Sequence, residues 1–143
     1  NEGEAKGEVR NIFKRKTIFL AETAHDLSVQ RNIIKRELQR HGYVVLPKNT
    51  LPASGDEFEK VVSKDLSESN FSIHLIGSAY GEIPEGRERS IVDIQNRLAA
   101  ETTAAKQQRQ EEFARLIWIA PNLRNASEKQ KNFIDSLKRD TEA

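Results

Sequence analysis

The residues best equipped for chemistry lie directly after the first apolar segment of the chain. Glu22, Thr23, His25 and Asp26 follow the strand-like run at 17–21 and open a helix. The carboxyl end of the first strand is where open parallel sheets usually place their ligands. A carboxylate there can accept hydrogen bonds from a ribose or an amide, which makes Glu22 the first candidate. Asp26 is expected to be the N-cap of the helix, and His25 to be exposed.

A second polar group surrounds the loop at 77–89, which is rich in glycine and proline. Tyr80 offers a ring that can stack on a base or on nicotinamide, with anchoring of the loop as an equal alternative. Gly81 would let a ligand approach the backbone closely. The helix expected from about Ser90 brings further polar side chains toward the same loop, among them Asp93.

The periodicity of apolar residues predicts the elements that position these groups. Short β-favouring runs alternate with helical stripes, which predicts a parallel sheet with helices on both faces. The right-handed crossover rule makes a flavodoxin-like three-layer α/β sandwich of strand order 2-1-3-4 the simplest topology, a fifth strand being left open. In that order the cluster after the first strand faces the loop at 77–89 across a crevice. The predicted strands are 17–21, 43–46, 71–76 and 116–120, and the helical stripes are 27–38, 58–66, 91–105 and 133–137.

Domain organisation follows from the same patterns. Residues 16–140 are expected to form one domain, and 1–15 a flexible arm or linker remnant, because this segment is charged and shows no sustained period. The sequence contains no methionine, even at its first position. We therefore expect a piece of a longer protein, whose attached sensor or effector domain is missing from this chain.

Composition argues against several classes of protein. The formal net charge is +1 over 143 residues, with no broad basic field, so nucleic acid is not an expected partner. The chain has no cysteine, and its three histidines lack the spacing of metal ligands, so no metal site is expected. No apolar run approaches the roughly 20 residues of a membrane span, and we predict a cytoplasmic protein without a membrane partner.

Five segments of the chain, taken in order, resemble the TIR domain (Toll/interleukin-1 receptor domain) of the bacterial type. They are FLAETAHDL, HGYVVLP, DLSESNFSIHLIGSAYG, SIVDIQNRLA and RLIWIAP. The resemblance implies signal transduction by self-association, with itself or with other TIR domains as partners, as in bacterial immunity. In some members it also implies hydrolysis of the nicotinamide–ribose bond of NAD, the NAD+ nucleosidase reaction.

The resemblance also implies which residues form the site. TIR enzymes carry a glutamate on the helix after the third strand, facing the ribose, and Gln95 stands at that place here. An amide cannot carry the negative charge that offsets a developing cation, so activity as an NAD glycohydrolase is uncertain. Asp93 is the nearest alternative, followed by Glu88 and Glu101. No tightly bound cofactor is expected, and NAD is the expected substrate or ligand; its pocket would be shaped by Glu22, Thr23, Tyr80, Gly81 and Ser90.

A purely non-catalytic scaffold for protein–protein interaction is the alternative to an enzyme. In a scaffold, the loop at 46–56 and the exposed helix faces would make the contacts with the partner protein. In an enzyme, the same loop would complete the NAD pocket. A response-regulator receiver does not fit, because the third strand ends in Ile76 and Gly77 without an aspartate. A deoxyribosyltransferase rests on fold analogy alone.

Three further positions are predicted to be structural. His74 lies within a strand covered on both faces and is expected to be a hydrogen-bonded core residue. Trp118, between two isoleucines, is expected to fill the core or seal its edge. Ser127 with Gln130 three residues later predicts a capping box before the last helix.

Overall fold

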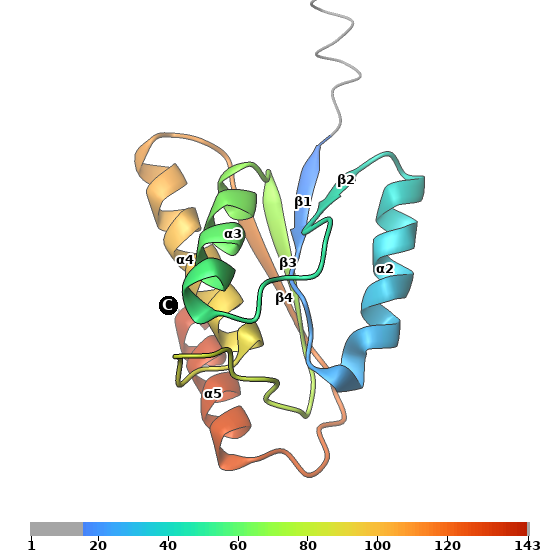
Figure 1. Cartoon of the computed structure of the whole chain (residues 1–143), viewed down its shortest axis with the longest axis vertical. Helices are drawn as coiled ribbons and strands as arrows, with labels where there is room; N and C mark the ends of the chain where they lie inside the picture. The colour runs from blue at the N-terminus through green and yellow to red at the C-terminus, as the bar shows by residue number, and fades with distance from the viewer. Residues whose placement is uncertain (1–15, 143) are drawn as a thin grey trace, which may run out of the picture.

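A computed structural model describes residues 16–142 (Figure 1). The predicted arm at 1–15 lies outside the described residues. Within 16–142, no helix is both long and apolar enough to cross a membrane. The elements in chain order are β1 (Thr17–Leu20), η1 (His25–Leu27), α2 (Ser28–Arg40), β2 (Val44–Leu46), α3 (Gly55–Ser67), β3 (Phe71–Ile76), α4 (Ile91–Gln108), β4 (Ala114–Ile119) and α5 (Glu128–Glu142).

The strands form one parallel sheet in the order β2-β1-β3-β4, which confirms the predicted flavodoxin-like α/β topology. β1 is central, and its last residue, Leu20, is in register with Ile73 of β3. The sheet has four strands among the described residues. Since the chain leaves β1 toward one edge and β3 toward the other, the carboxyl ends of these two strands flank the switch point of the topology.

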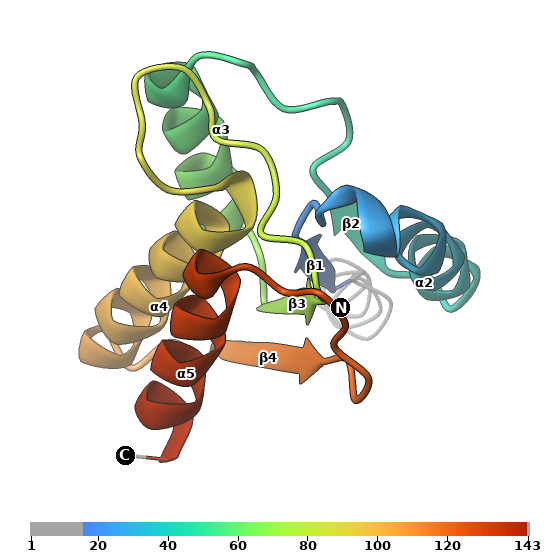
Figure 2. The ribbon, with the colours of Figure 1, turned by 90° about the horizontal axis from the view of Figure 1, so that it is seen from below.

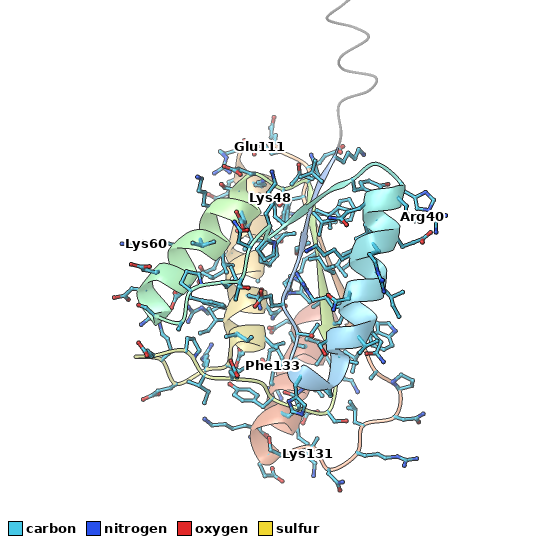
Figure 3. All side chains as sticks on the ribbon, turned by 45° about the vertical axis from the view of Figure 1, so that its right-hand side comes forward. Arg40, Lys48, Lys60, Glu111, Lys131 and Phe133 are labelled. Atoms are coloured by element: carbon cyan, nitrogen blue, oxygen red, sulfur yellow. The ribbon has the colours of Figure 1, made fainter. Side chains whose placement is uncertain are left out.

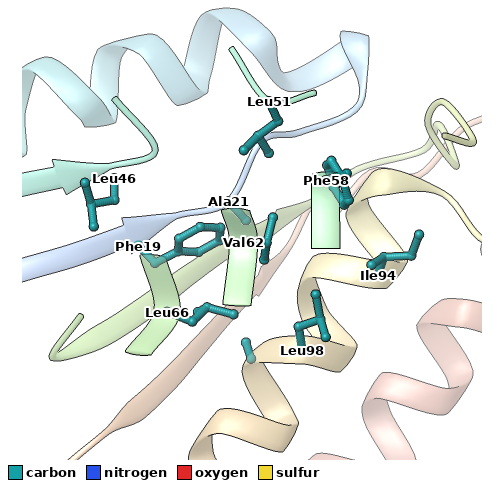
Figure 4. Packing of buried hydrophobic residues seen from close by; sticks show 10 residues of the cluster. Phe19, Ala21, Leu46, Leu51, Phe58, Val62, Leu66, Ile94 and Leu98 are labelled. Atoms are coloured by element: carbon teal, nitrogen blue, oxygen red, sulfur yellow. The ribbon is translucent and has the colours of Figure 1, made fainter. Parts of the chain in front are cut away.

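The larger hydrophobic core lies between the sheet and helices α3 and α4. Phe19 and Leu46 point from β1 and β2 onto the stripe of α3, and α4 closes the cluster (Figure 4). Burial of these side chains provides most of the favourable free energy of such a layer. The described members from the two helices are Phe58, Val62, Leu66, Ile94, Leu98 and Ala99.

Helix α5 extends the same layer over β3 and β4. Phe133, Ile134 and Leu137 pack on residues of these strands, including Ile76. Ser127 accepts a hydrogen bond from the Gln130 amide at 3.1 Å, so half of the predicted capping box is present. The other half is not, because the Gln130 side chain instead donates to the Gly77 carbonyl at 2.6 Å. α5 is thereby tied to the end of β3.

Among residues 16–142, α2 is the one helix on the opposite face of the sheet (Figure 2). No residue of α2 is buried, and Ile33, predicted to be part of its core stripe, faces solvent. Of the two places expected for Trp118, the core or its edge, the core is wrong, since the side chain is 47% exposed. The physical reason is its place on β4, the edge strand, where Ile117 and Ile119 pack toward α5 and Trp118 points to the other face.

Candidate functional site

A hollow of about 530 Å³ opens at the carboxyl end of β1, against the loop that follows β3. Four of the predicted pocket residues line it together: Glu22, Thr23, Tyr80 and Gly81. Ser90, the fifth, is fully buried behind it. The remaining lining residues are Ala24, His25, Ala79, Glu82 and Ile91.

A second hollow of about 370 Å³ continues from the first. The two share Glu22, Glu82 and Ile91, which therefore stand where they join. The outer wall of the second hollow comes from residues 50–53 of the loop that precedes α3, and from residues 83–85. We call the two hollows together the switch-point cleft.

The switch-point cleft is acidic. Glu22 and Glu82 line both hollows, Glu85 lines the second, and no lysine or arginine is among the lining residues. His25 is the remaining titratable group apart from Tyr80. Carboxylates accept hydrogen bonds from sugar hydroxyls and attract positive charge, more strongly in a partly enclosed site than in open water. The cleft therefore suits a ligand that is hydroxylated and cationic.

Arg31 supports the end of β1 from the α2 side. Its guanidinium donates to the carbonyl of Ala21 at 2.9 Å and to that of Leu20 at 2.8 Å. Burial lowers the pKa of Arg31, and the nearby charge of Glu22 opposes this shift. An arginine is thus held behind Glu22 by backbone carbonyls rather than placed in the cleft.

Gln95 holds the end of β1 from the α4 side. Its Oε1 accepts from the amide of Glu22 at 2.9 Å, and its Nε2 donates to the carbonyls of Glu22 and Ile91, each at 2.9 Å. The residue is fully buried. The Gln95 side chain thus makes the hydrogen bonds to the Glu22 amide and carbonyl that a neighbouring strand would make within a sheet.

In this arrangement Gln95 faces the backbone and not the cleft. It is absent from the lining of both hollows, and contact with a ribose would require it to break its three hydrogen bonds. Its role as a ribose-facing residue stays a prediction. What the structure does show is that Gln95 positions the backbone on which Glu22 is carried.

Asp26 is not the helix cap that its position predicted. η1 and α2 have no side-chain cap hydrogen bond, and Asp26 Oδ2 instead accepts from the amides of Ser78 and Ala79 at 2.9 and 3.2 Å. A β-carbon on Gly77 would collide with this carboxylate, so glycine is required there for close approach. Asp26 therefore fastens one wall of the cleft to the other.

Loss of this fastening should be measurable. Asp26→Asn keeps one acceptor but loses the charge that strengthens both bonds, so we expect about 1 kcal/mol of lost stability, the side chain being exposed. Urea unfolding of the variant beside Glu57→Gln, an exposed change on α3, measures it. Equal midpoints for the two variants would contradict the role given to Asp26.

Tyr80 is anchored as well as exposed to the cleft. Its hydroxyl donates to Asp93 Oδ2 at 2.9 Å and accepts from the Ser90 amide at 3.3 Å. Its ring packs edge-on against Phe133 and lies 5.6 Å from the Lys129 ammonium. Burial and the Asp93 carboxylate raise the pKa of Tyr80, so the phenol stays protonated.

Asp93, the alternative catalytic residue, lies outside the switch-point cleft. Besides Tyr80 it contacts Ser90, whose side chain caps α4 by accepting from the Asp93 amide at 3.2 Å. Asp93 lines a different hollow, beyond Tyr80, together with Arg89 and Lys129. Tyr80 therefore separates Asp93 from the cleft.

Hydrogen bonds and ion pairs also join the two loops that form the walls of the second hollow. Gly55 donates to the Glu85 carbonyl at 2.9 Å, and the Glu85 amide donates to Ala53 at 3.1 Å. Arg87 adds ion pairs to Asp56, at 2.7 Å, and to Glu59. The loop at 46–56 is thus joined to the loop at 77–89, and its Leu51 reaches the core (Figure 4).

Sequence reasoning missed Glu82 and undervalued His25, both of which line the larger hollow. Glu82 lies in a loop without periodicity, so nothing in the pattern marks it. Gly81 just before it is a usable signal, since its φ of 100° belongs to the left-handed region.

Comparison with known families gives one match. A family model described as a domain of unknown function (DUF4062) matches residues 17–142, which run from the first residue of β1 to the last of α5. No curated protein matches the chain. The family description names no reaction, ligand or partner.

Proposed function

The chain belongs to the DUF4062 family, and from its switch-point cleft we propose that it is a cytoplasmic TIR-like signalling module that self-associates and binds NAD by its nicotinamide–ribose half. The observation that carries this proposal is the pair Glu22 and Glu82 at the junction of the two hollows, with no basic residue among the lining. The order of the five TIR-like segments supports the same conclusion.

The nicotinamide–ribose half of NAD fits the chemistry of this cleft. The nicotinamide ring of NAD is a cationic pyridinium, and its ribose presents two hydroxyls that donate to carboxylates. The larger hollow, about 530 Å³, lies within the range of small-molecule sites. Ile91 and Ala79 supply apolar wall, and Glu22 and Glu82 supply the acceptors.

The reaction proposed for this site is hydrolysis of the nicotinamide–ribose bond. Departure of nicotinamide leaves a sugar with oxocarbenium character, and a nearby carboxylate stabilises that positive charge. Glu22 and Glu82 would act in place of the helix glutamate of TIR enzymes. Water attacks the anomeric carbon, nicotinamide leaves with the bonding electron pair, and ADP-ribose and a proton are the other products.

Nicotinamide release tests this function. Micromolar protein is incubated with NAD, with and without a crowding agent that favours assembly, and nicotinamide is followed by chromatography. We expect Glu22→Gln to lower the rate by about 100-fold, as loss of one electrostatic contact to a transition state commonly does. Glu57→Gln, an exposed change on α3 outside both hollows, is the control and should keep the full rate.

A non-catalytic scaffold is the second candidate, and one observation favours it. The position where TIR enzymes carry their glutamate is occupied by Gln95, whose polar atoms are committed to the backbone. If no nicotinamide is released in either condition while the protein assembles, the enzymatic proposal fails and the scaffold remains.

A further inference from the structure

The sheet face that α2 leaves open carries exposed apolar side chains without a described partner. β4 presents Leu116 and Trp118 on this face, 51% and 47% exposed. Helix α2, on the same face, turns Val29 and Ile33 to solvent, 66% and 53% exposed. Among residues 16–142, no helix lies beside α2 over β3 and β4 (Figure 2).

The geometry points to a second copy of this chain as the occupant: we propose that α2 of each copy docks on the open β3–β4 face of the other. This inference rests on the self-association included in the proposed function and names its surface. Each chain holds both halves of the contact, an uncovered apolar helix stripe and an uncovered strip of sheet. A two-fold axis parallel to the strands pairs them reciprocally, as an isologous dimer requires.

The spacings of the two halves agree. Val29 and Ile33 are four residues apart on α2, which is about 6 Å along a helix. Trp118 and Leu116 are two residues apart on β4, which is about 6.6 Å along a strand. Because α2 runs antiparallel to the strands, the partner's Val29 meets Trp118 while the partner's Ile33 meets Leu116.

Charge continues the match beyond the apolar residues. Arg36 and Arg40 extend the Val29–Ile33 stripe of α2 at helical spacing, and both are exposed. Glu111 and Glu112 precede β4 and are exposed as well. Arg40 and Glu111 lie toward the same end of the molecule (Figure 3). In the proposed dimer the arginines of one copy therefore approach the glutamates of the other.

Association is expected to be weak. Four apolar side chains per copy are few for a stable interface, so we expect a dissociation constant of about 10–100 μM. Such an affinity suits a module that assembles only when its local concentration rises. Trp118 is the single tryptophan of the chain and lies inside the proposed contact, so its fluorescence reports on occupancy.

Sedimentation equilibrium and tryptophan emission, measured from about 5 to about 500 μM, test the proposal. We expect dimers at the upper end, with the emission maximum moving to shorter wavelength as they form. Ile33→Glu and Leu116→Glu, each exposed and away from the core, should each weaken association at least about 10-fold. Val61→Glu, a matched change on the exposed side of α3, should leave it unchanged.

A charge exchange tests the orientation. Arg36→Glu alone and Glu112→Arg alone should each weaken the dimer, and the two changes together should restore it. If dimers form and none of these variants weakens them, the proposed contact between α2 and the β3–β4 face is wrong, although self-association itself stands. If the chain stays monomeric to the highest concentration, both the proposed contact and self-association are wrong. Nicotinamide release would still test the cleft separately. If the chain is monomeric and the Trp118 emission moves to longer wavelength when residues 1–15 are removed, the result would mean that this segment, and not a second copy, covers the sheet face.

Discussion

Gln95→Glu is expected to destabilise the fold by about 3–5 kcal/mol at neutral pH, and not to create an active enzyme. Gln95 Nε2 donates to two carbonyl oxygens, both at 2.9 Å, in a fully buried position. A carboxylate would place negative charge against these oxygens and leave both without a donor. Urea or thermal unfolding at pH 7 measures the loss.

The pH dependence of this variant identifies the cause. Burial among acceptors would hold the pKa of the introduced carboxyl above that of the unfolded chain. The variant should therefore approach the wild type below about pH 4, where the carboxyl is protonated in both states, and lose stability relative to it as pH rises. Gln107→Glu, exposed near the end of the same helix, should change stability by no more than about 0.5 kcal/mol. A stable Gln95→Glu variant that releases nicotinamide would contradict the structural role given to Gln95. It would instead support a position 95 side chain that faces the ribose.

His74 is expected to make the protein acid-labile over a defined pH range. Its Nε2 lies 2.9 Å from Ser72 Oγ, and burial, with the Arg115 charge as a smaller cause, lowers its pKa from 6.5 to about 3. Above pH 6.5 the ring is neutral in both states and this group does not affect the free energy of unfolding. Below 6.5 only the unfolded chain gains the proton, so stability falls by about 1.4 kcal/mol per pH unit until about pH 3.

Comparison of wild type with His74→Gln between pH 7 and pH 4 isolates this contribution. We expect the variant to be less stable at pH 7, through poorer packing, but to lose less stability on acidification. Asn32→Gln, an exposed change on α2 that removes no titratable group, is the control and should keep the wild-type slope over this range within about 0.5 kcal/mol per unit. Parallel curves for all three proteins would show that His74 gains its proton over the same pH range in the folded and the unfolded chain.

The fold was predictable because it depends on local patterns and general rules. Alternation of strand-like and helix-like periods, right-handed crossovers and short connections leave few topologies, and the order 2-1-3-4 is confirmed. His74 is buried and its Nε2 contacts Ser72 Oγ, as predicted, but its Nδ1 has no hydrogen-bond partner among the described residues. The cleft at the switch point also follows from the topology.

The details of the site were not predictable, because they depend on partners distant in sequence. Asp26 has the residue type and position of an N-cap, yet it binds amides 52 and 53 residues away. Gln95 looks like an ordinary polar helix residue, yet it completes the end of β1, 73 residues earlier. Trp118 was expected to fill the core or to seal its edge, and which strand lies at the edge of the sheet decides that it is exposed. In each case tertiary contacts override a local preference.

The position of NAD on the molecule tests the central claim most directly. In an amide nuclear magnetic resonance titration with NAD, we expect the largest shifts at residues 22–25 and 79–82, which line the larger hollow from both sides. Glu22→Gln should remove these shifts, and the amides of β4 around Trp118 should not respond. Shifts located elsewhere, or no response at millimolar NAD, would contradict the proposal that the switch-point cleft is a nicotinamide–ribose site.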